Sequence, residues 1–260
     1  MGDDKAATAA KLLMDAWEAG SPVPGLPKDC TPSNEAEAIA INDAIIAANT
    51  AKIGGWKIGA TGAAPQKALG LSQPFVGYIR AANVDTGATT YTFAELNRPI
   101  IESEYAYRLK SDLLARDKDY TRAEIEAAIG SLIIGMEVPL SRLGPDHGLG
   151  PLALVADHGG TGRFVIGAEY EDWKSIDTIN QDVVLTFHGA EAGRGTGEAM
   201  MGDPVNAVVW FANHMSGKGV GLKAGEFITT GSCTGVIPAP GPTVAIADFG
   251  PEGKVELTLK

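Results

Sequence analysis

From about residue 53 to its end, the chain is a series of short apolar runs separated by Gly, Pro, Asn and Asp. Runs of this length, rich in Val, Ile, Thr and aromatic residues, predict β-strands joined by turns. The runs that fit this description are IGGWKIGAT, FVGYIRAANV, TTYTFA, PIIESEYAYRL, LIIGMEVPLSR, RFVIG, DVVLTFHG, EFITTGS, TVAIADF and KVELTLK.

Only two helices are predicted among these strands. The first, TRAEIEAAI, opens with the capping box Thr121-x-x-Glu124. The second, DPVNAVVWFANHMSGKG, has Asp203 at its cap, Pro204 in its first turn and Gly217 at its end. Many strands with few helices predict a mixed sheet that curls or closes, not a doubly wound α/β fold.

Before residue 53 the sequence is helical in character. Residues 3–19 carry an apolar stripe at helical spacing that ends at Gly20. After a Pro- and Gly-rich link, residues 33–49 predict a second helix with Ser33 as its N-cap. The predicted fold is therefore α+β, with an N-terminal helical segment over residues 1–52 and a β-rich, barrel-like domain over residues 53–260.

Composition narrows the classes of function. The formal net charge of −11 over 260 residues opposes a nucleic-acid partner, because neutralising phosphates needs clustered Lys and Arg. No run of 18 apolar residues occurs and the N-terminus is acidic and Ala-rich, so we expect no membrane partner and no signal peptide. Cys30 and Cys233 form no motif, which favours a reduced, cytoplasmic chain.

Three glutamates occur where strands are normally apolar. Glu102 and Glu104 stand two apart in PIIESEYAYRL, so in an extended chain they point the same way, roughly 6.5–7 Å apart. Glu137 follows the apolar run LIIGM. They could be solvent-facing residues, or pair with nearby arginines (Arg98, Arg108 or Arg142). Alternatively, three carboxylates could hold a hard divalent cation, for which all-oxygen ligands indicate Mg²⁺ or Mn²⁺.

Histidine spacing gives no support for zinc, because the four histidines fall in no HxH or HExxH pattern. Two other segments carry candidate site residues. Lys57 lies in the apolar run GGWKIGAT, where it is either a surface lysine or one that binds a carboxylate or transfers protons with a lowered pKa. Asp157, His158 and Thr161 lie in the Gly-rich turn VADHGGTG, which either reverses the chain or carries polar site residues.

The glycine-rich stretch FHGAEAGRGTGEAMMGDP could be mistaken for a phosphate-binding loop. It lacks a GK[ST] sequence, and we interpret it as a mobile hairpin that precedes the helix capped by Asp203.

Six segments, in this order along the chain, carry a resemblance to a known family. They are GWKIGAT with QKALGLSQPFVGYI, RPIIESEYAYRL, MEVPLSR, ADHGGTGRFVIG, MGDPVNAVVWFAN and LKAGEFITTGS. Together they resemble the 2-keto-4-pentenoate hydratase / 4-oxalocrotonate decarboxylase group of the fumarylacetoacetate hydrolase superfamily.

The resemblance implies a β-rich fold with an N-terminal helical segment, assembled as a homo-oligomer, and a place in the breakdown of aromatic compounds. It implies a Mg²⁺ or Mn²⁺ site whose ligands fall on Glu102, Glu104 and Glu137. It implies Lys57 and Asp157 as catalytic residues, and Lys57, Thr161 and Ser232 as residues that bind a small 2-oxo acid. His158, which stands where the family has an asparagine, is a further candidate catalytic acid or base.

The reaction that the resemblance implies is a metal-dependent hydration of a 2-hydroxydienoate. Two departures from the family pattern bear on this choice. Phe75 stands where hydratases carry the aspartate of Q-P-D-x-G, and His158 replaces the asparagine of A-D-N. Phe75 favours the alternative of a 2-oxo acid decarboxylase. Two further alternatives are a C–C hydrolase that uses His158 as base, and a non-catalytic partner subunit.

Overall fold

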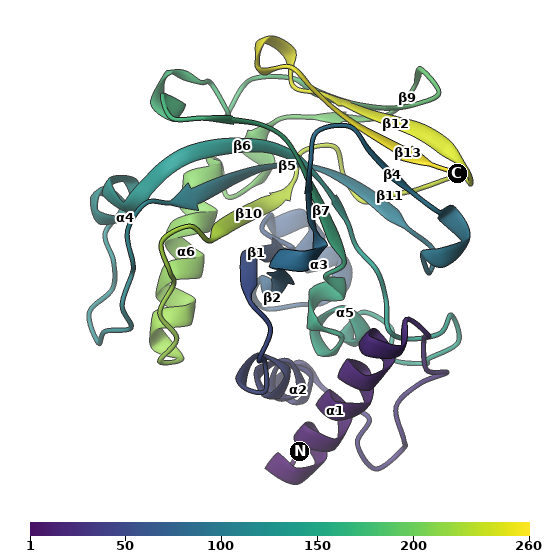
Figure 1. The fold of residues 1–260 in the computed structure, drawn as a ribbon. Coiled ribbons are helices and arrows are strands. Elements are labelled where there is room, and N and C mark those ends of the chain that lie inside the picture. The colour runs from purple at the N-terminus through teal and green to yellow at the C-terminus, as the bar shows by residue number, and fades with distance from the viewer.

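A strongly curved eight-stranded sheet forms the centre of the computed structural model, which describes all 260 residues (Figure 1). Its strands are β1 (Ile53–Gly59), β2 (Phe75–Arg80), β3 (Val84–Thr86), β5 (Ile100–Leu109), β6 (Ile129–Val138), β7 (Arg163–Tyr170), β10 (Phe227–Ser232) and β11 (Ile237–Pro238). The order is β2-β1-β10-β5-β6-β7-β3, with β11 beside β5. The β1–β10 and β3–β7 pairs are parallel and the others antiparallel, so the predicted mixed, curled sheet is confirmed.

A second sheet of five strands contains the C-terminus (Figure 1). Its strands are β4 (Thr89–Tyr91), β8 (Val183–Phe187), β9 (Ala190–Gly195), β12 (Thr243–Asp248) and β13 (Lys254–Leu259), in the order β4-β13-β12-β8-β9. Alternate residues of β12 and β13 are buried, so one face of this sheet packs onto the core and the other faces solvent. β8 and β9 form a hairpin, of which the turn and β9 lie in the glycine-rich stretch, whereas most of β8 precedes it.

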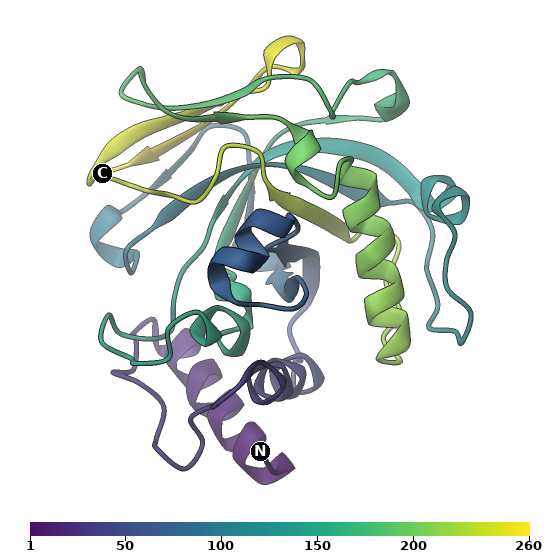
Figure 2. The same ribbon diagram turned by 180° about the vertical axis from the view of Figure 1, so that it is seen from behind.

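The N-terminal helices lie together at one end of the molecule with α5 (Leu152–Ala156) (Figures 1 and 2). Helix α1 (Asp3–Ala19) ends at Gly20, whose φ of +62° is the left-handed conformation typical of a helix end. Helix α2 (Glu35–Ala47) is capped by Asn34, not by Ser33 as predicted. The Asn34 side chain accepts the Glu37 N–H, whereas the Ser33 hydroxyl donates to the Glu37 carboxylate.

Two other helices behave as the sequence predicts. Helix α4 (Arg122–Ala128) has both hydrogen bonds of the Thr121–Glu124 capping box, and α6 (Pro204–Gly217) is capped by Asp203. The expectation of only two helices among the strands was wrong, because α5 and α3 (Ala63–Leu69) also form. Both are too short to show helical periodicity in the sequence.

Two apolar clusters occupy opposite faces of the curved sheet. The larger one unites the N-terminal helices with side chains such as Trp56, Tyr105 and Tyr107. The smaller one contains Ile79, Ala106, Ile133, Phe164, Ile166 and Phe227. Successive residues of a strand point to opposite faces, so Glu102 and Glu104 share the face of Ala106, and Glu137 that of Ile133. The fold therefore places all three glutamates on the face of the smaller cluster.

No helix here combines the length and the apolar character that crossing a membrane requires. Cys30 and Cys233 are buried and both are free.

Candidate active site

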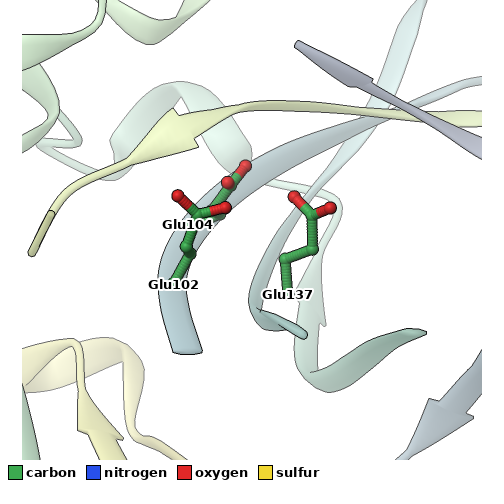
Figure 3. A group of neighbouring side chains, drawn as sticks. All are labelled: Glu102, Glu104 and Glu137. Atoms are coloured by element: carbon green, nitrogen blue, oxygen red, sulfur yellow. The ribbon is translucent and has the colours of Figure 1, made fainter. Parts of the chain in front are cut away.

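Three carboxylates meet where β5 and β6 run side by side (Figure 3). The strand register places Glu102 directly opposite Glu137, with Glu104 two residues further along β5. Each residue offers one oxygen, and these oxygens all lie within 4.8 Å of one another. Their exposed fractions are 6% for Glu102, 1% for Glu104 and 0% for Glu137, so the solvent-facing interpretation is wrong.

Lys57 on β1 supplies the positive charge nearest to these carboxylates. Its Nζ lies 3.1 Å from Oε1 of Glu137 and 3.6 Å from Oε2 of Glu102, and the side chain is buried. Burial alone would lower the pKa of Lys57, but the negative charges of Glu137, Glu102 and Glu104 outweigh it and raise that pKa above its ordinary value. Lys57 is therefore a charged partner of the cluster, with its pKa raised rather than lowered.

One ammonium group does not balance three carboxylates. Burial, reinforced by repulsion from Glu137 and Glu102, raises the pKa of Glu104 well above its ordinary value. Burial raises the pKa of Glu137 to about 7 even though Lys57 opposes the shift. Neither carboxylate oxygen of Glu137 accepts a hydrogen bond, so its contact with Lys57 is an ion pair without hydrogen-bond alignment.

These orphaned oxygens fit a bound cation. Buried polar atoms without a partner are rare in proteins, and a metal ion satisfies them as a hydrogen-bond donor would. The donor set is all oxygen and negatively charged, which suits Mg²⁺ or Mn²⁺ better than Zn²⁺. Glu102, Glu104 and Glu137 are therefore the residues that could hold a divalent cation.

Glu102 and Glu104 border a cavity of about 640 Å³. Its polar lining includes Lys57, Glu102, Glu104 and the side chains of Thr61, Arg194 and Ser232. Most of the remaining lining is apolar, and it comes from β1, α3, β2, β5, α5, the segment around Met200 and the β10–β11 connection. Glu137 lies beneath this surface, fully buried.

Ser232 is brought to this cavity, next to Glu104 in the strand register. Its hydroxyl donates to the carbonyl oxygen of Gly235 at 2.7 Å, which fixes its direction. Thr61 also lines the cavity, although sequence reasoning did not select it. The available signal was its position at the end of the GWKIGAT segment that contains Lys57.

Gly231 joins these residues through its backbone. Its N–H donates to Oε2 of Glu104 at 3.0 Å, so the orientation of this carboxylate depends on the local backbone. The φ of Gly231 is +107°, and a Cβ atom there would lie 2.4 Å from the Thr61 hydroxyl. No other residue fits at this position without displacing Thr61.

Asp157 is not part of the cavity lining and forms a buried ion pair with Arg142. The guanidinium Nε donates to Oδ1 of Asp157 at 2.6 Å, and the backbone N–H of Arg142 donates to Oδ2 at 2.8 Å. Burial raises the pKa of Asp157 although Arg142 opposes the shift. This geometry ties the chain after β6 to the turn after α5, and it gives the predicted catalytic role of Asp157 no support.

His158 and Thr161 also lie outside the cavity lining. Nε2 of His158 accepts the backbone N–H of Tyr78 at 2.8 Å, while Nδ1 lies 2.7 Å from the Asn42 side-chain oxygen and donates to it. Burial, helped by the charge of Arg142, lowers the pKa of His158 well below its ordinary value. With both ring nitrogens engaged, His158 has no free lone pair for a base. Thr161 is fully buried, and its carbonyl oxygen accepts from Arg142.

Phe75 does line the cavity, on the strand next to Lys57. Its ring centroid lies 5.9 Å from Nζ of Lys57. The ring packs against Gly59, where a Cβ atom would come within 2.1 Å of it. An aromatic side chain therefore forms part of the cavity wall beside Lys57.

No family model matches the chain. Curated relatives nevertheless match nearly its whole length. The 2-keto-4-pentenoate hydratase of Paraburkholderia phymatum is 31% identical over 251 residues, which are 95% of this chain and 92% of the relative. That of Burkholderia vietnamiensis is 32% identical over 254 residues, 96% of this chain and 93% of the relative. This chain belongs to the 2-keto-4-pentenoate hydratase family. Another relative, the 2-hydroxyhexa-2,4-dienoate hydratase of Comamonas testosteroni, is 34% identical over 71% of this chain and 70% of its own length.

Solved structures support the predicted architecture. The 4-oxalocrotonate decarboxylase of Pseudomonas putida G7, complexed with magnesium and adipate, superposes with a TM-score of 0.87 at 23% identity, covering 100% of this chain and 99% of that chain. The fumarylpyruvate hydrolase of Pseudomonas aeruginosa, in complex with Mn²⁺ and pyruvate, gives a TM-score of 0.59 at 15% identity, over 78% of this chain and 88% of that one. At these identities the likeness concerns the fold, and it confirms the fumarylacetoacetate hydrolase-type architecture of this family member.

Proposed function

We propose that this protein is a divalent-metal-dependent hydro-lyase that hydrates a 2-hydroxydienoate or the corresponding unsaturated 2-oxo acid. The observation that carries the proposal is the buried cluster of Glu102, Glu104 and Glu137, with Lys57 beside it, at the wall of a cavity large enough for such an acid. The cluster occurs in a chain whose curated relatives are hydratases of these compounds.

The proposed cofactor is Mg²⁺ or Mn²⁺, held by the three carboxylates. When bound, the cation would supply positive charge to the keto and carboxylate oxygens of a 2-oxo acid, where negative charge develops during the reaction.

Lys57 is the proposed residue for proton transfer or for orienting the substrate carboxylate. It is the charged hydrogen-bond donor closest to the cluster. Its strand pairs with β2, and its ammonium group is held by the ion pairs with Glu137 and Glu102. The reaction requires a proton on the terminal carbon C5 of the dienol as its enol proton is lost, which gives a 3-en-2-oxo acid. A water molecule then adds its oxygen to C4 and its proton to C3. The Thr61 and Ser232 hydroxyls line the space in which the substrate would lie.

Decarboxylation of a 2-oxo-enedioate is the alternative reaction. One specific observation favours it, namely that Phe75 occupies the cavity where a hydratase aspartate would stand, so no carboxylate there can orient water. A non-catalytic role is less well supported, because the three carboxylates and Lys57 are all in place. We further propose a homo-oligomeric assembly, which size measurement in solution would test.

A direct assay separates the two reactions. The protein is supplied with 2-hydroxypenta-2,4-dienoate or with 2-oxohex-3-enedioate, in the presence of Mg²⁺ or Mn²⁺. Loss of dienol absorbance without release of CO₂ is the expected result. Release of CO₂ from the enedioate would support the alternative, and turnover of neither acid by the metal-loaded protein would refute both.

A further inference from the structure

Three hydroxyl side chains line the cavity, those of Thr61, Ser232 and Thr234. The Ser232 hydroxyl donates to the carbonyl oxygen of Gly235 at 2.7 Å, and the Thr234 hydroxyl donates to Oγ of Ser103 at 3.2 Å. The Thr61 hydroxyl makes no hydrogen bond within the chain, although the side chain is only 6% exposed. Thr61 therefore carries the one hydroxyl of the lining that is free to bind a ligand.

The charged donors of the lining are already engaged with the protein. Lys57 forms ion pairs with two of the three glutamates of the cluster, and Arg194 forms ion pairs with two exposed carboxylates. An oxygen of a ligand that loses its water in this cavity needs a new hydrogen-bond donor, because burying it without one costs free energy. The hydroxyl of Thr61 can supply that bond without breaking an existing one.

Gly231 brings this hydroxyl to the carboxylate end of the cavity. A Cβ atom at Gly231 would lie 2.4 Å from Oγ1 of Thr61, so the hydroxyl occupies the room that the missing side chain leaves. The N–H of the same glycine donates to Oε2 of Glu104 at 3.0 Å. One residue of β10 therefore contacts both the free hydroxyl and a proposed metal ligand.

The backbone in front of Thr61 is strained. Ala60 has a φ of +55°, a left-handed value that is uncommon for residues other than glycine and that concentrates at functional sites. Its carbonyl oxygen accepts a hydrogen bond from Nε2 of Gln66 on α3 at 2.8 Å, which holds this conformation. Because β1 ends at Gly59, the bend at Ala60 sets the direction in which the Thr61 side chain leaves the strand.

We infer that Thr61 contacts the substrate, its hydroxyl donating a hydrogen bond to an oxygen of the 2-oxo acid end. This inference rests on the proposed function and adds a substrate-binding residue to it. The 2-oxo acid end presents two carboxylate oxygens and a keto oxygen, all of which accept hydrogen bonds. A hydroxyl that bonds to an ionised carboxylate makes one of the stronger hydrogen bonds of proteins.

Binding of an unreactive acid tests this independently of turnover. With Mg²⁺ present, calorimetry measures the affinity of 2-oxopentanoate for the wild type and for Thr61→Val, which keeps the shape of the side chain but lacks the hydroxyl. The variant binds the acid about tenfold more weakly, as expected for the loss of one hydrogen bond to a charged group. Thr61→Ala shows a similar loss, whereas Thr61→Ser keeps the hydroxyl and retains most of the affinity.

Binding of Mn²⁺ separates contact with the substrate from support of the metal site. All three variants bind Mn²⁺ as the wild type does in equilibrium dialysis. Wild-type affinity for the acid in Thr61→Val, an equal loss in Thr61→Ser, or a fall in Mn²⁺ affinity that accounts for the loss would each overturn the inference alone. Failure of the metal-loaded wild type to bind the acid would overturn it together with the proposed function.

Thr90→Val is the matched control for the loss of a hydroxyl. Thr90 is an exposed threonine on β4 and does not line the cavity. Its variant binds both the acid and Mn²⁺ as the wild type does. A loss of acid affinity in Thr90→Val as large as in Thr61→Val would show that the effect does not come from the cavity, and would contradict the role of Thr61.

Discussion

Glu102 and Glu137 face each other directly across the β5–β6 pair, and both side chains are buried. Like charges at opposed positions of two strands destabilise a sheet, and burial adds to the cost. The ammonium group of Lys57 offsets the repulsion and the cost of burial only in part. Such a local conflict, unneeded for packing, is typical of a site selected for binding or catalysis.

Lys57→Met removes the positive charge while keeping most of the side-chain volume. Removing one partner of a buried ion pair leaves the other charge uncompensated, so the free energy of unfolding in metal-free buffer falls by about 3 kcal/mol. Added Mg²⁺ recovers more stability in the variant than in the wild type, because the cation no longer competes with the ammonium. Urea denaturation with EDTA and with Mg²⁺ measures both effects.

Lys223→Met is the control for this substitution, because Lys223 pairs with Asp112 at the exposed surface. It should change stability little. A Lys57→Met protein that is as stable as the wild type without metal would show that the ion pair is misassigned.

Asp157→Asn tests whether this residue acts in structure or in catalysis. The substitution breaks the buried pair with Arg142 and lowers the free energy of unfolding by about 3 kcal/mol, measured by urea denaturation. Asp15→Asn, which breaks the exposed pair with Lys11, has little effect and serves as control. A variant with wild-type stability but strongly reduced turnover would instead give Asp157 the catalytic role that its sequence position suggested.

His158→Asn changes how stability depends on pH. Folded His158 stays neutral because its pKa is lowered, while in the unfolded chain it takes up a proton below about pH 6.5. The unfolded state then binds more protons, so wild-type stability falls as pH drops through this window, by up to about 1.4 kcal/mol per pH unit from this residue. The positive charges of Arg142, Arg80 and Lys57 also lower the pKa of folded His158. The His158→Asn variant lacks the histidine, so its stability loses the part of the pH dependence that comes from this residue.

Asparagine suits position 158 because φ there is +54°, a left-handed value that Asn tolerates better than most residues. The matched control is His188→Asn, since His188 also has a positive φ, +48°, but is exposed. Denaturation curves between about pH 7 and pH 5 give the comparison. Identical pH dependence in wild type and His158→Asn would show that His158 is not buried as a neutral ring.

The predictable parts of the fold are those that local sequence determines. The Thr121–Glu124 capping box, the Asp203 cap and the end of α1 at Gly20 each depend on a few neighbouring residues. The strand order does not depend on neighbouring residues alone, because β1 pairs with β10, which lies much further along the chain. At α2, two residues able to cap a helix stand side by side, and it is Asn34 that has the extended backbone of the cap and accepts the Glu37 N–H.

In the candidate site too, some residues could be predicted from local sequence and others depend on contacts between distant parts of the chain. Glu102, Glu104, Glu137 and Lys57 could be selected because each is a charge within an apolar strand, and the register brings them together. The turn VADHGGTG also looked like a site, but its polar side chains point to partners far away in sequence, such as Asn42. Thr61 was missed because a threonine at the end of a strand has no distinctive pattern.

Binding of Mn²⁺, measured by equilibrium dialysis, tests the central claim most directly. The wild-type chain should bind one ion per chain at the carboxylate cluster, and Glu102→Gln together with Glu104→Gln should abolish this binding while the protein stays folded. Glu256→Gln, an exposed carboxylate on β13, should bind as the wild type does. Equal binding by the double variant and the wild type would contradict the assignment of these glutamates as the metal site.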